Sequence, residues 1–182
     1  MIFREITLPG AFVIEVQRLE DERGFFGRIF CRREFLAHGL NPDVVQCSIS
    51  FNRKAGTLRG MHYQDAPHAE DKLIRCSRGA LYDVIIDLRE GSPTFRQWEA
   101  VELMEDNRRM LYVPKGFAHG FQTLADNTEV IYQMSEFYHP ESARGVRWND
   151  PAFGIRWPDA DRAILSERDR EWPDYPQSKT GG

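Results

Sequence analysis

The 182-residue sequence has few cysteines, and none of them is paired by spacing. Cys31, Cys47 and Cys76 are far apart and form no Cys-x-x-Cys motif. An odd number of widely spaced cysteines argues against a disulfide framework or a zinc ribbon. Such cysteine usage is typical of a reducing compartment, so we expect a cytoplasmic protein.

Long apolar runs and an excess of one charge are also missing. The wholly apolar runs, such as Val84-Ile85-Ile86, are only a few residues long, so no membrane span is expected. The N-terminus has charged residues where a signal peptide needs an apolar stretch. The 24 Lys and Arg and 28 Asp and Glu residues are interspersed, so no nucleic-acid-binding surface is expected. A local cluster of cations would still suffice for one small anion.

Short apolar or alternating stretches bounded by turn residues make up most of the sequence. The predicted strands are 11–16, 25–31, 44–50, 57–63, 73–77, 80–88, 97–103, 110–113, 120–125 and 129–135. Strands at roughly 8–12-residue spacing are typical of an antiparallel sandwich or barrel. Helical periodicity is confined to 33–38 and, weakly, to 160–170.

No repeat or linker divides the chain, so a single domain over residues 1–182 is expected. From Tyr138 onward, regular structure is interrupted by Pro140, Pro151, Pro158 and Pro173, which predicts a loop-rich segment with one helix packed outside the barrel. The last residues, from about 174 to 182, have the composition of a flexible tail. The predicted fold is therefore all-β, an antiparallel jelly roll with short peripheral helices that are mostly C-terminal.

Three clusters of polar residues are candidates for chemistry. In Leu58–Gln64, Arg59 and His62 would face opposite sides of a regular strand, so a bulge at Gly60 is needed for both to serve one pocket. The alternative is a surface arginine and a hydrogen-bonded core histidine. His119 lies between small residues, and Tyr132 shares a strand face with apolar neighbours; each alone is typical of packing. Together they indicate acid–base chemistry on an anionic ligand.

Other reaction classes lack their motifs. There is no G-x-S-x-G nucleophile elbow, no P-loop and no G-x-G-x-x-G fingerprint. Metal-dependent jelly rolls often carry a His-x-His pair followed by a Glu, but here Gly60 and Gln64 stand two places either side of His62. We therefore expect neither a catalytic metal nor a cofactor.

Six blocks of the sequence together resemble the dTDP-4-dehydrorhamnose 3,5-epimerases, a family of RmlC-type sugar-nucleotide epimerases. They follow one another in the family's order over residues 2–173, and they are 21–26, 58–64, 72–76, 91–95, 114–121 and 148–150. The resemblance implies a cupin-like jelly roll, a homodimer with strand exchange, and metal-independent epimerisation of a nucleotide sugar next to its 4-keto group.

The resemblance also implies three catalytic roles. His62 matches the general base, Asp169 the carboxylate that orients it, and Tyr132 the general acid on the opposite face of the sugar. The chemistry agrees, because inversion needs one group to remove a proton and a different group to return it. An imidazole ordinarily titrates near working pH, whereas a phenol stays protonated there.

Further positions match substrate contacts of the family. Lys72 and His119 match groups around the ketone oxygen, with Asp83 as support, and Arg59 matches the clamp on the diphosphate. The remaining matched positions are Arg23, which the family supplies from the dimer partner, Gln46 in the nucleotide-contact segment, Tyr138, which stacks on the base, and Arg168.

Three positions depart from the family pattern. Arg28 and Ala143 stand where the family has Glu, and Ser48 stands where it has Asn. All three lie on the nucleotide side. Two interpretations are open: an altered base preference, or compensation by Gln46 and Tyr138, since stacking tolerates any base.

Four functions are weighed on these grounds. The leading hypothesis is a cofactor-free epimerase that acts on a nucleoside-diphosphate 4-keto-6-deoxyhexose in deoxysugar biosynthesis. A C3-only epimerase, or an isomerase on another nucleotide sugar, would use the same groups. A non-catalytic sugar-nucleotide-binding cupin would need no acid opposite a base. A metal-dependent cupin enzyme lacks its ligands.

Overall fold

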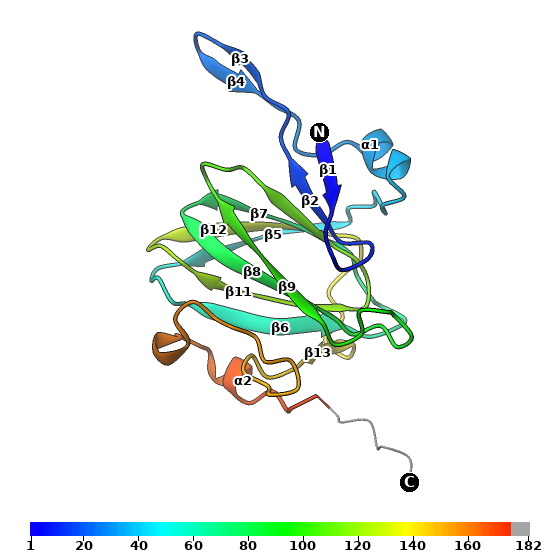
Figure 1. Cartoon of the computed structure of the whole chain (residues 1–182), viewed down its shortest axis with the longest axis vertical. Helices are drawn as coiled ribbons and strands as arrows, with labels where there is room; N and C mark the ends of the chain where they lie inside the picture. The colour runs from blue at the N-terminus through cyan, green and yellow to red at the C-terminus, as the bar shows by residue number, and fades with distance from the viewer. Residues whose placement is uncertain (176–182) are drawn as a thin grey trace.

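Two antiparallel sheets face each other in the computed structural model, which describes residues 1–175 (Figure 1). The six-stranded sheet has the order β1 (Ile2–Glu5), β2 (Phe12–Glu15), β10 (Met110–Val113), β7 (Lys72–Arg78), β12 (Thr128–Met134) and β5 (Gln46–Asn52). The five-stranded sheet has the order β13 (Ala143–Gly145), β6 (Leu58–Gln64), β11 (Phe117–Thr123), β8 (Ala80–Asp87) and β9 (Trp98–Met104). This is the predicted jelly roll.

A hairpin of β3 (Leu19–Asp21) and β4 (Gly24–Phe26) projects away from the two sheets (Figure 1). The helices are short: α1 (Arg32–Ala37) follows the hairpin, and a 3₁₀ turn (Ala160–Arg162) and α2 (Glu167–Arg170) lie near the C-terminal end. No helix within residues 1–175 is long and apolar enough to cross a membrane.

The predicted strands agree with the observed ones within three residues at each end, except for 25–31. There the extended backbone ends at Phe26, and the ring of Phe30 packs against Phe35 of α1 with centroids 5.0 Å apart. Residues 27–31 therefore do not extend the strand, and Phe30 packs on the helix instead. The predicted strand over 25–31 was wrong beyond Phe26.

The predicted helix over 160–170 is divided into two turns. Between them, Ile164 is extended, because its N–H donates to Gly56 O (2.9 Å) and its carbonyl accepts from Leu58 N (2.8 Å). A new helix then begins after Ser166, whose side chain accepts from Asp169 N. Tertiary hydrogen bonds to β6 and its turn therefore override the local helical pattern.

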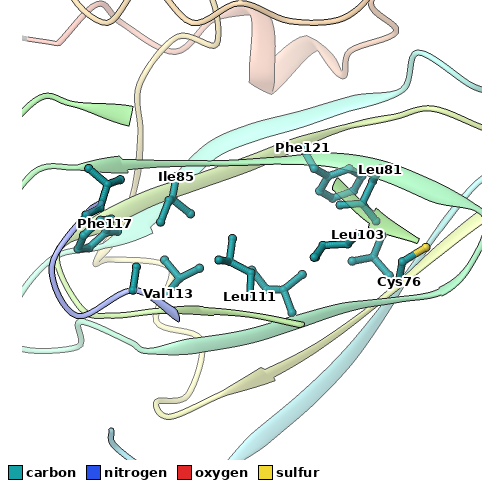
Figure 2. Close-up of a cluster of buried hydrophobic side chains, with 12 residues drawn as sticks. Cys76, Leu81, Ile85, Leu103, Leu111, Val113, Phe117 and Phe121 are labelled. Carbon is teal, nitrogen blue, oxygen red and sulfur yellow. The ribbon is translucent and has the colours of Figure 1, made fainter. Parts of the chain in front are cut away.

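An apolar core fills one part of the space between the sheets. Figure 2 shows its side chains, Ile85 and Phe121 among them, meeting Leu111 and Val113 from the opposite sheet. Burying a side chain of this size contributes about 1.5–3 kcal/mol before chain entropy is counted. Alternation along the same strands also turns Asp83 and His119 inward, so this interior is not wholly apolar.

The C-terminal segment covers the outer face of the five-stranded sheet. Phe153 and Trp157 pack there on Leu58 and Met61 of β6. The segment therefore runs beneath β6 and brings α2 alongside it (Figure 1). Of the predicted tail, Asp174 pairs with Arg147 at 2.7 Å, while 176–182 lie outside the described residues.

Candidate active site

A bulge in β6 brings two predicted site residues to the same side of the strand. His62 pairs with His119 of β11, but Arg59 pairs with Phe121, so β6 contains one extra residue between them. Gly60 lies at this bulge with a φ of 144°, and a Cβ there would lie 2.6 Å from Gly120 Cα. The predicted bulge at Gly60 is confirmed, and only glycine fits it.

His62 and Asp169 form a hydrogen-bonded pair. The Nε2 atom of His62 lies 2.6 Å from Oδ1 of Asp169, whose side chain is 7% exposed. Burial raises the pKa of Asp169, but the hydrogen bond and charge of His62, together with hydrogen bonds from Ser166 and the Gly60 backbone, outweigh it, so the net pKa lies below the ordinary value. The carboxylate is therefore ionised at neutral pH and suited to stabilise an imidazolium.

Tyr132 of β12 lies on the inner side of the opposite sheet. Its ring meets that of His119 edge-on, with centroids 6.1 Å apart. Burial and the charge of Asp83 raise the pKa of Tyr132 well above its ordinary value, and Arg59 opposes them only in part. The phenol therefore keeps its proton at neutral pH.

His119 has a buried acidic partner of its own. Its Nε2 lies 2.5 Å from Oδ1 of Asp83, and both side chains are at most 5% exposed. Burial raises the pKa of Asp83, while the charge and hydrogen bond of His119 lower it in part. Asp83 thus fixes the orientation of His119, as the resemblance implies.

Two polar residues that the sequence did not indicate contact the predicted cations Lys72 and Arg59. Oε1 of Glu70 lies 3.2 Å from Nζ of Lys72, which also donates to the carbonyl of His62 at 3.4 Å. Arg59 Nε donates to Oδ1 of buried Asn52 at 2.8 Å. Glu70 is close in sequence to Lys72, and Asn52 precedes Arg59 by one turn between strands, but residue type alone does not show which polar side chains pair, so no signal pointed to Glu70 or Asn52.

Most of the predicted site residues line two cavities, of about 350 and 400 Å³, which share Glu70 and Tyr138. One is lined by Arg59, His62, Arg168 and Asp169, among others, and the second by Gln46, Ser48, Lys72 and Tyr132, among others. The shared residues make the two cavities one continuous site, with His62 on one side and Tyr132 on the other.

Trp172 forms a wall beside His62. Its ring meets the imidazole edge-on at 6.2 Å, and Cζ of Arg168 lies 5.2 Å from its centroid. It rests on Gly145, where a Cβ would lie 2.3 Å from the indole Cε2. Gly145 pairs with His62 between β13 and β6, so the indole that rests on Gly145 lies beside His62. Trp172, like Glu70, is therefore a site residue that the sequence did not indicate.

Three predicted site residues line neither cavity: His119 and Asp83, which form a buried pair, and Arg23. Arg23 lies at the turn of the projecting hairpin, where its side chain is 89% exposed and pairs with Asp21. Of the three positions that depart from the family pattern, Ser48 and Ala143 line the cavities, whereas Arg28 pairs with Glu34 at 2.8 Å.

One group with metal-ligand composition occurs among residues 1–175, and it lies outside the lining of both cavities. It consists of His68, His139 and Glu141, whose ligand atoms are within 4.8 Å of one another. His62 is not part of it, in keeping with its hydrogen bond to Asp169.

Comparison with known proteins gives a consistent result. A family model described as dTDP-4-dehydrorhamnose 3,5-epimerase matches residues 5–177. A protein of that name from Sinorhizobium fredii is 40% identical over 173 residues, covering 95% of this chain and 89% of the relative.

Solved structures are similar over nearly the whole chain. The dTDP-4-dehydrorhamnose 3,5-epimerase of Elizabethkingia anophelis has a TM-score of 0.93 at 38% identity, with 96% of each chain covered. That of Bacillus anthracis, solved with TDP and PPi bound, has a TM-score of 0.92 at 42% identity, covering 96% of this chain and 99% of the other.

Proposed function

The chain belongs to the dTDP-4-dehydrorhamnose 3,5-epimerase family, and from that premise we infer how its own residues act. It is an epimerase, and its substrate is a dTDP-linked 4-keto-6-deoxyhexose of deoxysugar biosynthesis. The observation that supports this activity best is the position of His62, backed by Asp169, across one continuous site from Tyr132.

His62 is the proposed general base. Because its Nε2 is held by Asp169, Nδ1 is the atom that takes a proton from the carbon next to the ketone. The electron pair of the broken C–H bond moves into an enolate, and the proton remains on the imidazole, whose charge Asp169 balances. A side chain that is 41% exposed can later return this proton to water.

The enolate oxygen requires fixed positive charge or hydrogen-bond donors. Lys72, held by Glu70, and His119, held by Asp83, are proposed to supply them. Tyr132 then donates its phenolic proton to the opposite face of the same carbon, which inverts it, and recovers a proton from solvent. The raised pKa of Tyr132 keeps that proton in place until the enolate forms.

The rest of the site is proposed to bind the nucleotide. Arg59 and Arg168 line the His62 side and suit the diphosphate, since guanidinium groups form paired hydrogen bonds with phosphate oxygens. Tyr138 is 54% exposed at the shared rim of the two cavities and is placed to stack on the base. Its backbone N–H donates to Oε1 of Gln46 at 2.9 Å, which fixes the rim.

A homodimer is proposed as the active form. Leu19 and Phe26 of the projecting hairpin are 64% and 72% exposed, and Ile49 of β5 is 61% exposed. Exposed apolar side chains of this size on a projecting hairpin favour a protein partner. A second copy would cover them and bring its Arg23 to this chain's cavity.

Proton NMR of dTDP-4-keto-6-deoxyglucose with the enzyme in deuterated water tests the activity. We expect deuterium and inversion at both C3 and C5. Exchange at C3 alone would identify a one-centre epimerase, and tight binding without any exchange would identify a binding protein. A second assay with UDP- and GDP-linked 4-keto sugars establishes whether turnover depends on the identity of the nucleotide.

A further inference from the structure

Two histidines and a glutamate from separate loops meet at the surface outside the catalytic cavities. His68 lies between β6 and β7, and His139 and Glu141 lie between β12 and β13. The two imidazoles are stacked, with centroids 3.5 Å apart and planes 10° from parallel. We propose that these three residues form a binding site for a divalent transition-metal ion of the zinc and copper class.

The spacing of the donor atoms suits such an ion. His139 Nδ1 and Glu141 Oε1 are 3.1 Å apart. Two neighbouring ligands that each lie about 2.1 Å from a zinc ion are roughly 3.0–3.4 Å apart. An ion can therefore replace the proton between these atoms with little movement, and a tilt of the His68 ring brings its nitrogen to the same ion. Two imidazoles and one carboxylate leave a further position open for water.

His68 already has the second hydrogen bond that metal-ligating histidines ordinarily make. Its Nδ1 contacts Oγ of Ser142 at 2.9 Å, and this serine is 6% exposed. A ligating histidine ordinarily uses its second nitrogen in such a bond, which fixes the ring and leaves the first nitrogen for the ion. Nε2 of His68 is therefore the metal-facing atom.

Charge and access also favour a cation. Oε1 of Glu136 lies 4.0 Å from Nε2 of His139, so two carboxylates surround the imidazoles. The side chain of Glu141 is 66% exposed, which gives an ion from solvent a direct approach.

The ion would fasten together two loops that Gln64 already joins. The amide of Gln64 donates to His68 O and to Phe137 O, both at 3.0 Å, and accepts from His139 N at 2.7 Å. Because a bound ion stabilises the folded chain over the unfolded one, metal binding raises the melting temperature. The site is distinct from the catalytic groups, so turnover does not depend on it.

Calorimetric titration of the chelator-treated, full-length protein with Zn²⁺ tests the proposal, with thermal unfolding as a second measurement. We expect one tight site per chain and a higher melting temperature with Zn²⁺. His68→Asn and His139→Asn should each weaken binding by roughly tenfold or more, as loss of a ligand requires, and should remove the thermal shift.

His38→Asn is the matched control, because His38 is an exposed histidine that contacts Glu34 O, apart from the cluster. It should leave the titration unchanged. Equal binding by the wild type and the double variant His68→Asn/His139→Asn would overturn the proposal. So would a binding site that disappears in His62→Asn instead, since the ion would then belong to the catalytic pair.

Discussion

At the scale of single residues, the proposed role of His62 as the base depends on the charge of its partner Asp169. Asp169→Asn keeps the size of the side chain but removes the charge that balances the imidazolium. We expect turnover to fall by about 10²–10⁴-fold, the range for loss of acid–base function. Steady-state kinetics measures the loss, and a cooperative unfolding transition well above the assay temperature would separate it from unfolding. Turnover close to wild type would show that His62 needs no charged partner.

The same pair gives the stability a pH dependence of definite sign. Because the pKa of Asp169 is lower in the folded chain, the unfolded chain binds more protons as the pH falls. The stabilisation is therefore fully present above about pH 4, near the ordinary pKa of an aspartate, and is lost as the pH falls further. Melting temperatures from pH 7 to pH 3 should fall more steeply for the wild type than for Asp169→Asn. Parallel curves would contradict the assignment.

The groups proposed to carry the chemistry were predictable, whereas those that position them were not. The resemblance to the epimerase family assigned roles to His62, Tyr132 and Asp169, and the residue types of His62 and Tyr132 agree with acid–base chemistry. Glu70 contacts Lys72 and Asn52 contacts Arg59, and both contacts depend on how the side chains are placed in the fold. Trp172 lies beside His62 because it rests on Gly145 of β13. Such pairings depend on the fold, and one sequence has no periodicity that marks them.

At the scale of elements, Gly145 of β13 fixes the distance between the C-terminal segment and β6. Gly145→Ala would place a methyl group within 2.3 Å of the Trp172 indole and displace it from His62. We expect a loss of about 1–3 kcal/mol in the free energy of unfolding, as for other overpacked sites, together with slower turnover. Denaturant unfolding and kinetics measure the two effects.

A double variant is the control for this contact. If the methyl group acts by clashing with the indole, Gly145→Ala combined with Trp172→Ala should cost less than the sum of the two single changes. Full additivity would show that Gly145 is needed for another reason. A fully stable and active Gly145→Ala protein would show that the wall beside His62 is not required.

Strand positions followed from the alternation of apolar and polar residues, but the predictions for 25–31 and 160–170 failed where other contacts decide the structure. Residues 27–31 have strand-like composition, yet Phe30 packs on α1. The helical pattern of 160–170 is broken at Ile164, which bonds to Gly56 and Leu58. The partners of Ile164 are distant in sequence, whereas Phe30 packs on the helix that follows it directly, and in both cases packing and hydrogen bonds outweigh local propensity.

At the scale of the whole molecule, the exposed hairpin leads us to predict that two chains share each active site. Arg23→Ala and His62→Ala chains should each be inactive alone. In a mixed dimer, the chain with intact His62 receives Arg23 from its partner, so one of its two sites works. Random mixing makes about half of the dimers mixed, and hence restores about one quarter of wild-type activity. An active monomer, or no recovery after proven subunit exchange, would contradict the shared site.

The nucleotide pocket is tested by calorimetric titration of dTDP, UDP, CDP and GDP. Arg28 is paired with Glu34, while Gln46 and Tyr138 remain at the cavity, which favours compensation over an altered base preference. We therefore expect dTDP to bind most tightly. Equal affinity for the four diphosphates would show that Arg28, Ser48 and Ala143 have changed the base preference.

The division of labour between His62 and Tyr132 is tested most directly by deuterium exchange in two variants. Proton NMR of the dTDP-4-keto sugar in deuterated water measures wash-in at C3 and C5 separately from inversion. His62→Ala should abolish both, because no proton is removed. Tyr132→Phe, which keeps the ring but lacks the hydroxyl, should retain wash-in and give little inverted product. Wild-type inversion by Tyr132→Phe, or exchange by a folded His62→Ala protein, would contradict the account.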